Sequence, residues 1–349
     1  MARESLRRLP KAVLHDHLDG GVRPATVLEL AEAVGYEGLP AVNAGELGRW
    51  FYRGDSASLP EYLEAFDQTL AVMQTADALE RVAYEAIIDL ADDGVVYAEI
   101  RFAPMLHQAR GLTPEQVLDA VLVGIRSGST ATGMEARVIV AAMRQHDDSA
   151  EVARVAASFR GRGVVAFDLA GPEAGFPASL HREACRLAGD SGLGLTIHAG
   201  EGDGVPSVAD ALECGAERLG HGVRIAEDVV WEDGAAIRLG PVAAAVRDRR
   251  IALEVSPSSN LDTKAYPSIA EHPVGNLHRA GFTVTLNTDN RLMSGTSMSR
   301  EFSLAVEHQG FTVADLRTVT LQAVDAAFCD DETRNRLRER LEDGYRGVS

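Results

Sequence analysis

Eight short apolar segments, separated by longer stretches with helical periodicity, are the feature that most constrains how this chain of 349 residues can fold. Most of the short segments are continuously apolar, as buried parallel strands are. The stretch 76–92, by contrast, repeats its apolar residues every three or four positions, which predicts a helix with one buried face. This alternation indicates repeated βα units. We expect strands at residues 11–17, 94–102, 137–143, 164–171, 193–200, 218–222, 251–259 and 282–289.

Eight such units predict a TIM (β/α)8 barrel of the α/β class. Active sites of this fold lie at the C-terminal ends of the strands, so we expect residues capable of chemistry at those ends and nowhere else along the strands. No low-complexity linker, charge block or fixed-period repeat interrupts the sequence, and 46% hydrophobic content can supply a large core. Residues 1–349 are therefore predicted to form a single domain, with amphipathic helices after about residue 301 closing the barrel.

The segment 58–75, which follows the first strand, is an insertion with an apolar helical face. That face carries Leu59, Tyr62, Leu63 and Phe66. It fits a lid over a pocket and, equally well, a helix packed on the flank of the barrel.

The composition disfavours several kinds of partner. Asp and Glu outnumber Lys and Arg by 52 to 34, and the resulting net charge of −18 opposes binding to nucleic acid and to anionic membrane surfaces. No apolar run approaches the eighteen residues of a membrane span, and the charged N-terminal segment lacks the apolar centre of a signal peptide. Cys185, Cys214 and Cys329 form no C-x-x-C pair, which is usual in a reducing compartment. We therefore expect a cytoplasmic protein.

Two histidines, His15 and His17, end the first expected strand. Alternate residues of a strand point to the same face, so the two imidazoles project together. An isolated pair of this kind is a weak signal for a metal site. Three other expected strands, however, also end in groups suited to chemistry, namely His198, Glu201, His221, Asp289 and Asn290.

Three imidazoles and one carboxylate are a usual ligand set for catalytic zinc that keeps one position open for water. We assign His15, His17, His198 and Asp289 to one Zn²⁺. Zinc lowers the pKa of its water to roughly 7, and His221 could then take or hold the released proton. Glu201 remains as the acid.

The other histidines are expected to have surface or packing roles, because they lie mostly in predicted helices or loops; they are His107, His146, His181, His272, His278 and His308. Arg101 and Arg291 lie near strand ends, where they could meet a substrate carboxylate. An arginine in the mouth of a barrel more often pairs with an acidic neighbour, and we favour that role for both.

Five motifs, in this order and spacing, resemble the adenosine deaminase family of metal-dependent amidohydrolase-like barrels. They are "LHDHLDG", "FDLAGPE", "TIHAGE", "RLGHG" and "NTDN", and the resemblance runs from about Lys11 to Met298. "HAGE" and "LGHG" together are highly specific, and "SLPEYLEAFD" looks like the segment that bears the family's hydrophobic lid. The resemblance implies hydrolytic deamination of adenosine and 2′-deoxyadenosine to inosine and 2′-deoxyinosine, with release of ammonia.

The resemblance also implies a role for each matching position. His15, His17, His198 and Asp289 would hold one zinc ion, and His221 would orient the attacking water and help take its proton. Glu201 would give a proton to purine N1, which requires a raised pKa in a poorly solvated pocket. Asp289 is thus both a ligand and a catalytic residue. The candidates for binding the nucleoside are His17, Asp19 at the ribose hydroxyls, Gly171 at N3, and Asn290.

Asn290 departs from the family pattern, which usually has a second aspartate there to contact purine N7. An amide N–H₂ donates a hydrogen bond without proton uptake, whereas a carboxylate must first be protonated. The contact can survive, but the change leaves the preferred base open.

Several alternatives remain to be weighed against this assignment. The chain has no C-x-x-C, which excludes the zinc deaminases built on H-x-E and P-C-x-x-C. The fourth strand has no lysine, which favours one metal ion over two. Asp19 would repel a 5′-phosphate and suits a neutral nucleoside. A 6-aminopurine nucleoside with another 5′ substituent, such as aminodeoxyfutalosine, stays open, and a non-catalytic metal-binding barrel is disfavoured because Glu201 and His221 are both present.

Overall fold

The computed structural model describes residues 3–54, 56 and 59–348 and contains one eight-stranded parallel sheet. Its strands follow the order β1-β2-β3-β4-β5-β6-β9-β10, each paired with the next. All eight predicted strands are confirmed, as β1 (Lys11–His17), β2 (Val95–Phe102), β3 (Glu135–Met143), β4 (Val164–Ala170), β5 (Gly194–Ala199), β6 (Arg218–His221), β9 (Ala252–Val255) and β10 (Val284–Leu286).

The sheet closes into a barrel where the chain after β10 meets β1. Asp16 and Asp289 form a parallel bridge, the His17 N–H donates to the Asp289 carbonyl at 2.8 Å, and the Asp289 N–H donates to the His15 carbonyl at 2.9 Å. This closure places the "HDH" and "NTDN" segments side by side although about 270 residues separate them.

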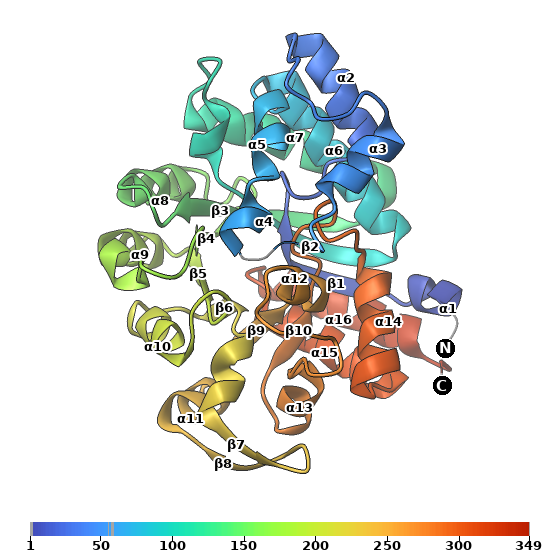
Figure 1. The fold of residues 1–349 in the computed structure, drawn as a ribbon, viewed down its shortest axis with the longest axis vertical. Coiled ribbons are helices and arrows are strands. Elements are labelled where there is room, and N and C mark those ends of the chain that lie inside the picture. The colour runs from blue at the N-terminus through green and yellow to red at the C-terminus, as the bar shows by residue number, and fades with distance from the viewer. Residues whose placement is uncertain (1–2, 55, 57–58, 349) are drawn as a thin grey trace.

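Helices surround the strands (Figure 1), which confirms the TIM barrel predicted from the alternation. They are α1 (Arg3–Arg8), α2 (Pro24–Val34), α3 (Ala44–Phe51), α4 (Leu59–Leu63), α5 (Phe66–Val72), α6 (Ala76–Asp92), α7 (Pro114–Thr132), α8 (Ser149–Ser158), α9 (Arg182–Asp190), α10 (Val205–Glu213), α11 (Pro241–Asp248), α12 (Pro257–Asp262), α13 (Val274–Arg279), α14 (Met298–Gln309), α15 (Val313–Ala326) and α16 (Asp331–Tyr345). The described part of the chain also contains three short 3-10 helices, η1 (Pro104–His107), η2 (Ala178–His181) and η3 (Val223–Asp228).

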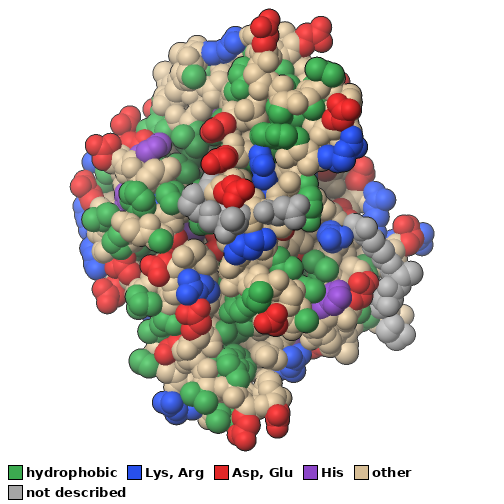
Figure 2. Space-filling view, in the orientation of Figure 1, with side chains coloured by type: hydrophobic (Ala, Val, Ile, Leu, Met, Phe, Trp, Pro, Cys, Tyr) green, Lys and Arg blue, Asp and Glu red, His purple; other side chains and the backbone are tan. Residues whose placement is uncertain are grey.

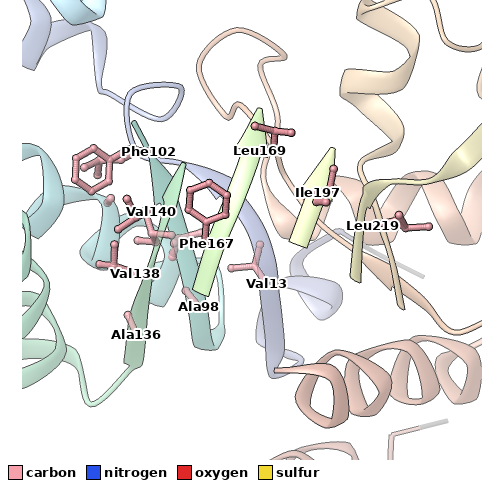
Figure 3. Close-up of a cluster of buried hydrophobic side chains, with 14 of the residues drawn as sticks. Val13, Ala98, Phe102, Ala136, Val138, Val140, Phe167, Leu169, Ile197 and Leu219 are labelled. Atoms are coloured by element: carbon pink, nitrogen blue, oxygen red, sulfur yellow. The ribbon is translucent and has the colours of Figure 1, made fainter. Parts of the chain in front are cut away.

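Apolar side chains from neighbouring strands form the main core (Figure 3). Phe167 and Leu169 of β4 belong to it and are fully buried. Asp168, which lies between them, bonds instead to His198 and to Arg101 inside the barrel. Because side chains alternate along a strand, one strand thus packs apolar groups on one face and presents a charge on the other.

The predicted seventh and eighth strands, 251–259 and 282–289, are too long, since β10 covers only Val284–Leu286. β9 ends at Val255 and α12 begins at Pro257. Proline at the first position of a helix loses no hydrogen bond, because that N–H has no partner within a helix. The polar run "PSSN" therefore belongs to a helix at the mouth of the barrel.

An antiparallel hairpin between β6 and β9 was not predicted. It consists of β7 (Val229–Glu232) and β8 (Ala235–Leu239) and projects at the lower edge of Figure 1. Asp233 and Gly234 join the strands with φ angles of 48° and 77°. Asp-Gly with positive φ at both positions is a favoured hairpin turn, so the sequence did contain the signal.

The inserted segment after β1 includes α4 and α5, whose apolar face points to a pocket. Leu59, Tyr62, Leu63 and Phe66 all line that pocket, which supports the lid over the flanking helix. Residue 58, the first of the expected lid segment, lies outside the described residues.

The surface agrees with the composition. Figure 2 shows acidic side chains spread over one face of the molecule, with Lys and Arg side chains between them. Among the described residues, no helix combines the length and the apolarity that a membrane crossing requires. The three cysteines are free thiols.

Candidate active site

A cavity of about 290 Å³ lies under the lid, where the strands of the barrel end. Apolar side chains of α4 and α5 form one side of its wall, and most of its polar groups come from the ends of the strands. Eight of the candidate site residues singled out from the sequence line it, namely His17, Asp19, Gly171, His198, Glu201, His221, Asp289 and Asn290. His15 lies beneath them and is fully buried.

The four predicted metal ligands converge on one point. Asp289 Oδ1 lies 3.2 Å from His15 Nε2 and 3.3 Å from His17 Nε2. His17 Nε2 lies 3.4 Å from His198 Nε2, and one donor atom from each of the four residues lies within 4.8 Å of every other. His15 Nε2 is buried and has no hydrogen-bond partner in the described part of the chain.

Two carboxylates below this cluster set the orientation of its imidazoles. His15 Nδ1 lies 3.0 Å from Glu254 Oε2, and His198 Nδ1 lies 3.1 Å from Asp168 Oδ1. An ionised carboxylate only accepts hydrogen bonds, so each imidazole donates its Nδ1–H and turns the Nε2 lone pair to the centre. Several acceptor atoms facing one another are stabilised by a cation between them.

The charges around His15 point to the same conclusion. Burial and the nearby Arg101 lower the pKa of His15, yet the carboxylates of Asp289 and Glu254 raise it overall. The base of the cavity thus favours positive charge. Nitrogen and oxygen donors of this kind suit a borderline divalent cation, so the residues present fit a metal ion.

Charged side chains also lie inside the barrel, which contradicts the expectation that such residues occur only at strand ends. Glu99, Asp168, Arg218 and Glu254 lie within strands and are at most 1% exposed. Barrel interiors are packed and dry, so charges persist there only when paired. Each of these four is paired.

The pairs form one connected network under the histidines. Arg101 donates to Asp168 at 3.0 Å and to Glu254 at 2.6 Å, and Arg218 lies 2.7 Å from both Glu254 and Glu99. Arg291 likewise donates to Asp16 at 2.8 Å. The prediction that Arg101 and Arg291 pair with acidic neighbours is confirmed. A charged residue within an otherwise apolar strand was the sequence signal for this network.

Glu201 follows β5 and lies 3.3 Å from His221 Nε2 through its Oε2. Burial, reinforced by the negative charge of Asp289, raises the pKa of Glu201 well above its ordinary value. Glu173 holds the loop in place, because its carboxylate accepts the backbone N–H groups of Gly200, Glu201 and Gly202. Glu201 can therefore carry a proton at neutral pH and donate it.

The short helix α12 and the residue after it contact three of the candidate catalytic groups. Ser259 donates to Asp289 Oδ2 at 2.6 Å, and Thr263 Oγ1 lies 2.8 Å from Glu201 Oε1. Asn260 Nδ2 lies 3.0 Å from His221 Nδ1. Sequence reasoning missed these contacts. The run of small polar residues after Pro257 was the only available signal.

Two of the candidates have an unusual backbone. His221 and Asp289 adopt positive φ angles of 62° and 54°. Non-glycine residues in this region store about 1–3 kcal/mol each and cluster at functional sites. Both residues line the cavity.

Polar atoms of the predicted nucleoside-binding residues are buried without partners. Asp19 Oδ1 and Asn290 Oδ1 have no hydrogen-bond partner among the described residues, and burial raises the pKa of Asp19 to about 7. Gly171 has a φ of 94°, and a Cβ there would lie 2.5 Å from Gln145. These groups are placed to bind a polar ligand.

Most of the remaining histidines have the packing or surface roles expected of them. His107 bonds to the Met73 carbonyl and His181 to Ser149 and the Arg144 carbonyl, and both are buried. His146 is exposed and lies at the rim of the cavity. His272 is buried and bonds to Asn260.

Comparison with known proteins identifies relatives over nearly the whole chain. The adenosine deaminase family model matches residues 10–344. An adenosine deaminase from Mycobacterium ulcerans is 53% identical over 333 residues, covering 93% of this chain and 92% of the relative. A solved amidohydrolase with bound Zn from Burkholderia ambifaria is 26% identical with a TM-score of 0.86, covering 98% and 92%. An Arabidopsis N6-mAMP deaminase is 28% identical with a TM-score of 0.84, covering 97% and 99%. The chain belongs to the adenosine deaminase family.

Proposed function

We propose that this chain, as one domain spanning residues 1–349, is a cytoplasmic, zinc-dependent enzyme that deaminates adenosine and 2′-deoxyadenosine. Water replaces the 6-amino group, so the products are inosine or 2′-deoxyinosine and ammonia. The convergence of His15, His17, His198 and Asp289 beside Glu201 and His221 carries this proposal. The relatives named adenosine deaminase at about 50% identity support it.

His15, His17, His198 and Asp289 would hold a single Zn²⁺. Their donor atoms are the right kind, and His15 Nε2 has no hydrogen-bond partner among the described residues. The solved relative with bound Zn supports the choice of metal. Zinc in such a site supplies Lewis acidity that makes water far more acidic.

Glu201 would hold a proton on its carboxyl group and pass it to purine N1, which makes C6 more electrophilic. Burial and the negative charge of Asp289 favour the protonated form. His221, which lies 3.3 Å from Glu201, would orient the attacking water. Ser259 holds Asp289 in place by donating a hydrogen bond to its Oδ2. The lid residues Leu63 and Phe66 would exclude bulk water.

The charges of the cavity favour a nucleoside over a nucleotide. Among the residues that the structure describes, no Lys or Arg lines the cavity, whereas Asp19, Asp67, Glu201 and Asp289 do. A 5′-phosphate would meet negative charge and no cation. The N6-mAMP deaminase of similar fold acts on a nucleotide, and this chain is expected to differ from it in that respect.

A spectrophotometric assay of the zinc-loaded protein tests the substrate. We expect turnover of adenosine and 2′-deoxyadenosine, and much less with AMP, adenine and aminodeoxyfutalosine. A clear preference for aminodeoxyfutalosine would reassign the substrate. Turnover of none of the five would favour a metal-binding barrel without catalysis.

Replacing Glu201 by Gln tests the proton donor. The amide cannot release a proton, so kcat should fall by about 10²–10⁴-fold while the zinc content stays at the wild-type level. Glu227→Gln, at an exposed glutamate paired with Arg224, is the matched control and should leave kcat unchanged. Wild-type turnover by Glu201→Gln would remove Glu201 from the mechanism.

A further inference from the structure

A chain of hydrogen bonds runs from the backbone of α13 to the candidate acid Glu201. The Val274 N–H donates to His272 Nδ1 at 3.3 Å, and His272 Nε2 lies 3.2 Å from Asn260 Oδ1. Asn260 Nδ2 lies 3.0 Å from His221 Nδ1, whose Nε2 lies 3.3 Å from Glu201 Oε2. His272, Asn260, His221 and Glu201 are all at most 6% exposed. No bulk water therefore competes for these bonds.

The direction of every bond in this chain follows from its first member. A backbone N–H can only donate, so His272 Nδ1 accepts and the single ring proton of His272 is on Nε2. Burial lowers the pKa of His272 to about 3, in agreement with a neutral ring. His272 Nε2–H then donates to Asn260, which places the carbonyl oxygen of the amide toward His272 and its N–H₂ toward His221.

The same reasoning fixes the proton on His221. An amide N–H₂ can only donate, so His221 Nδ1 accepts and carries no proton. The ring proton of His221 is on Nε2, the atom that faces Glu201. Asn260 belongs to α12 and His272 to the segment just before α13, so elements after β9 determine the state of a residue at the end of β6.

We propose that Asn260 and His272 are positioning residues that hold His221 as its Nε2–H tautomer, which makes His221 a hydrogen-bond donor and prevents it from binding the metal. This inference rests on the proposed function, because it assigns His221 its part in the same site. It revises the expectation that His221 takes a proton from water. In the resting site His221 Nε2 has no free lone pair, so it orients and stabilises the reacting oxygen by donating to it.

The neighbouring imidazoles show the opposite arrangement. His15 and His198 donate Nδ1–H to Glu254 and Asp168, which leaves Nε2 as an acceptor. Their rings lie 4.8 Å and 5.4 Å from that of His221, centroid to centroid. By distance alone Glu201, His221 and Asp289 could also hold a metal ion. The hydrogen-bond direction separates the two sets and leaves one metal site.

Nitrogen NMR of protein labelled with ¹⁵N-histidine tests the tautomer directly, without reference to turnover. Both the zinc-loaded and the metal-free wild-type protein should show His221 with a proton on Nε2 and a bare Nδ1. Asn260→Asp replaces the donor by an acceptor, so its carboxylate should draw the ring proton to Nδ1. A wild-type His221 protonated on Nδ1, or a tautomer unchanged in Asn260→Asp, would overturn the proposal.

Kinetics supply the second measurement. Asn260→Asp should lower kcat by about 10²-fold, with KM within about threefold of wild type and zinc content unchanged. His272→Gln keeps a donor toward Asn260, so it should preserve the Nε2–H signal of His221. Asn276→Asp, in α13 and bonded to Arg279, is the control for the added charge and should match wild type in all three measurements.

The outcomes distinguish failure of this inference from failure of the proposed function. A wild-type protein that turns over no nucleoside but shows the expected tautomer would contradict the function alone. An active wild-type enzyme in which Asn260→Asp keeps full kcat would contradict the positioning role alone.

Discussion

The buried carboxylates of this protein divide into two regions with opposite behaviour. Inside the barrel, burial alone would raise the pKa of Glu254, but Arg101 and Arg218 hold it well below its ordinary value. Beside α12, burial raises the pKa of Glu301 to about 7, and the pKa of Glu201 is raised as well. Glu254 and Glu301 are both 0% exposed, so exposure does not explain the difference.

The comparison shows that the neighbouring cations, more than the depth of burial, decide which carboxylates are charged. Arginines accompany the acidic groups of the interior, so these stay ionised and can orient neutral imidazoles toward a metal ion. Beside α12, Ser258 and Thr296 donate hydrogen bonds to Glu301, and Thr263 contacts Glu201. Neutral hydrogen-bond donors stabilise a buried carboxylate less than an arginine does, so the pKa of both carboxyl groups stays raised. The molecule thus combines a charged interior with two carboxyl groups beside α12 that hold their protons more tightly than usual.

Removing one charge from the network inside the barrel should have the largest effect on stability. Glu254→Gln leaves Arg101 and Arg218 without a shared counter-charge and should lower the free energy of unfolding by about 3–5 kcal/mol. It should also weaken metal binding by about 10–100-fold, because His15 loses the carboxylate that orients it. Urea unfolding and metal titration measure the two effects.

The matched control is Glu342→Gln on the surface. Glu342 accepts a hydrogen bond from Arg317 at 3.0 Å, and both side chains are 43% exposed. The free energy of unfolding should therefore fall by less than about 1 kcal/mol. Equal losses in the two variants would mean that the interior network contributes no more than a surface pair.

Replacing Glu301 by Gln should change the free energy of unfolding less, and in the opposite direction. Glu301 has a pKa of about 7 in the folded protein against 4.5 ordinarily, so the folded state binds the proton more tightly. This contribution to stability is complete below pH 4.5 and is lost as the pH rises to 7 and above. Glu301→Gln should therefore match wild type near pH 4.5 and exceed it at pH 8 by up to about 3 kcal/mol.

Thermal or urea unfolding from pH 4.5 to 8 measures this difference, with the exposed Glu271→Gln as control. The amide can still accept from the Ser258 N–H and donate to Thr296, so the hydrogen bonds of Glu301 are retained. A wild-type curve parallel to that of Glu301→Gln would show that Glu301 is ionised in the folded state.

Truncating a lid side chain should have the smallest effect, which is a change in the pKa of Glu201. Phe66 lines the cavity, with its ring 6.5 Å from that of His17. Phe66→Ala would admit water to the cavity and so lower the pKa of Glu201. Because the protonated acid is the active form, the fall of kcat/KM at high pH should move to lower pH.

The pH profile of kcat/KM measures this shift. Tyr84→Ala, a truncation on the surface of α6 away from the cavity, should leave the profile unchanged. An unchanged profile for Phe66→Ala would mean that the lid does not control the solvation of Glu201.

Much of the fold and of the candidate site could be predicted from the sequence. Apolar runs and helical periodicity are local signals, and they identified every strand of the barrel. His15 and His198 end such runs, so fold topology brings them together without further information. The β7–β8 hairpin was missed although its Asp-Gly turn is a local signal, and β9 was drawn too long across Pro257.

The contacts of Asn260, His272 and Glu254 could not be predicted in the same way. Asn260 lies 39 residues from His221, and Glu254 lies 239 residues from His15. No periodic pattern links such residues, since the closure of the barrel and the path of α12 bring them together.

The sequence by itself determined the order of strands and helices and the kinds of donor atom at the strand ends, because both follow from residues near one another along the chain. Only the tertiary structure decided which carboxylates are charged, which ring nitrogen of each histidine carries the proton, and which face of the lid meets the cavity. Those properties depend on the charges, donors and acceptors within a few ångströms, and these come from distant parts of the chain.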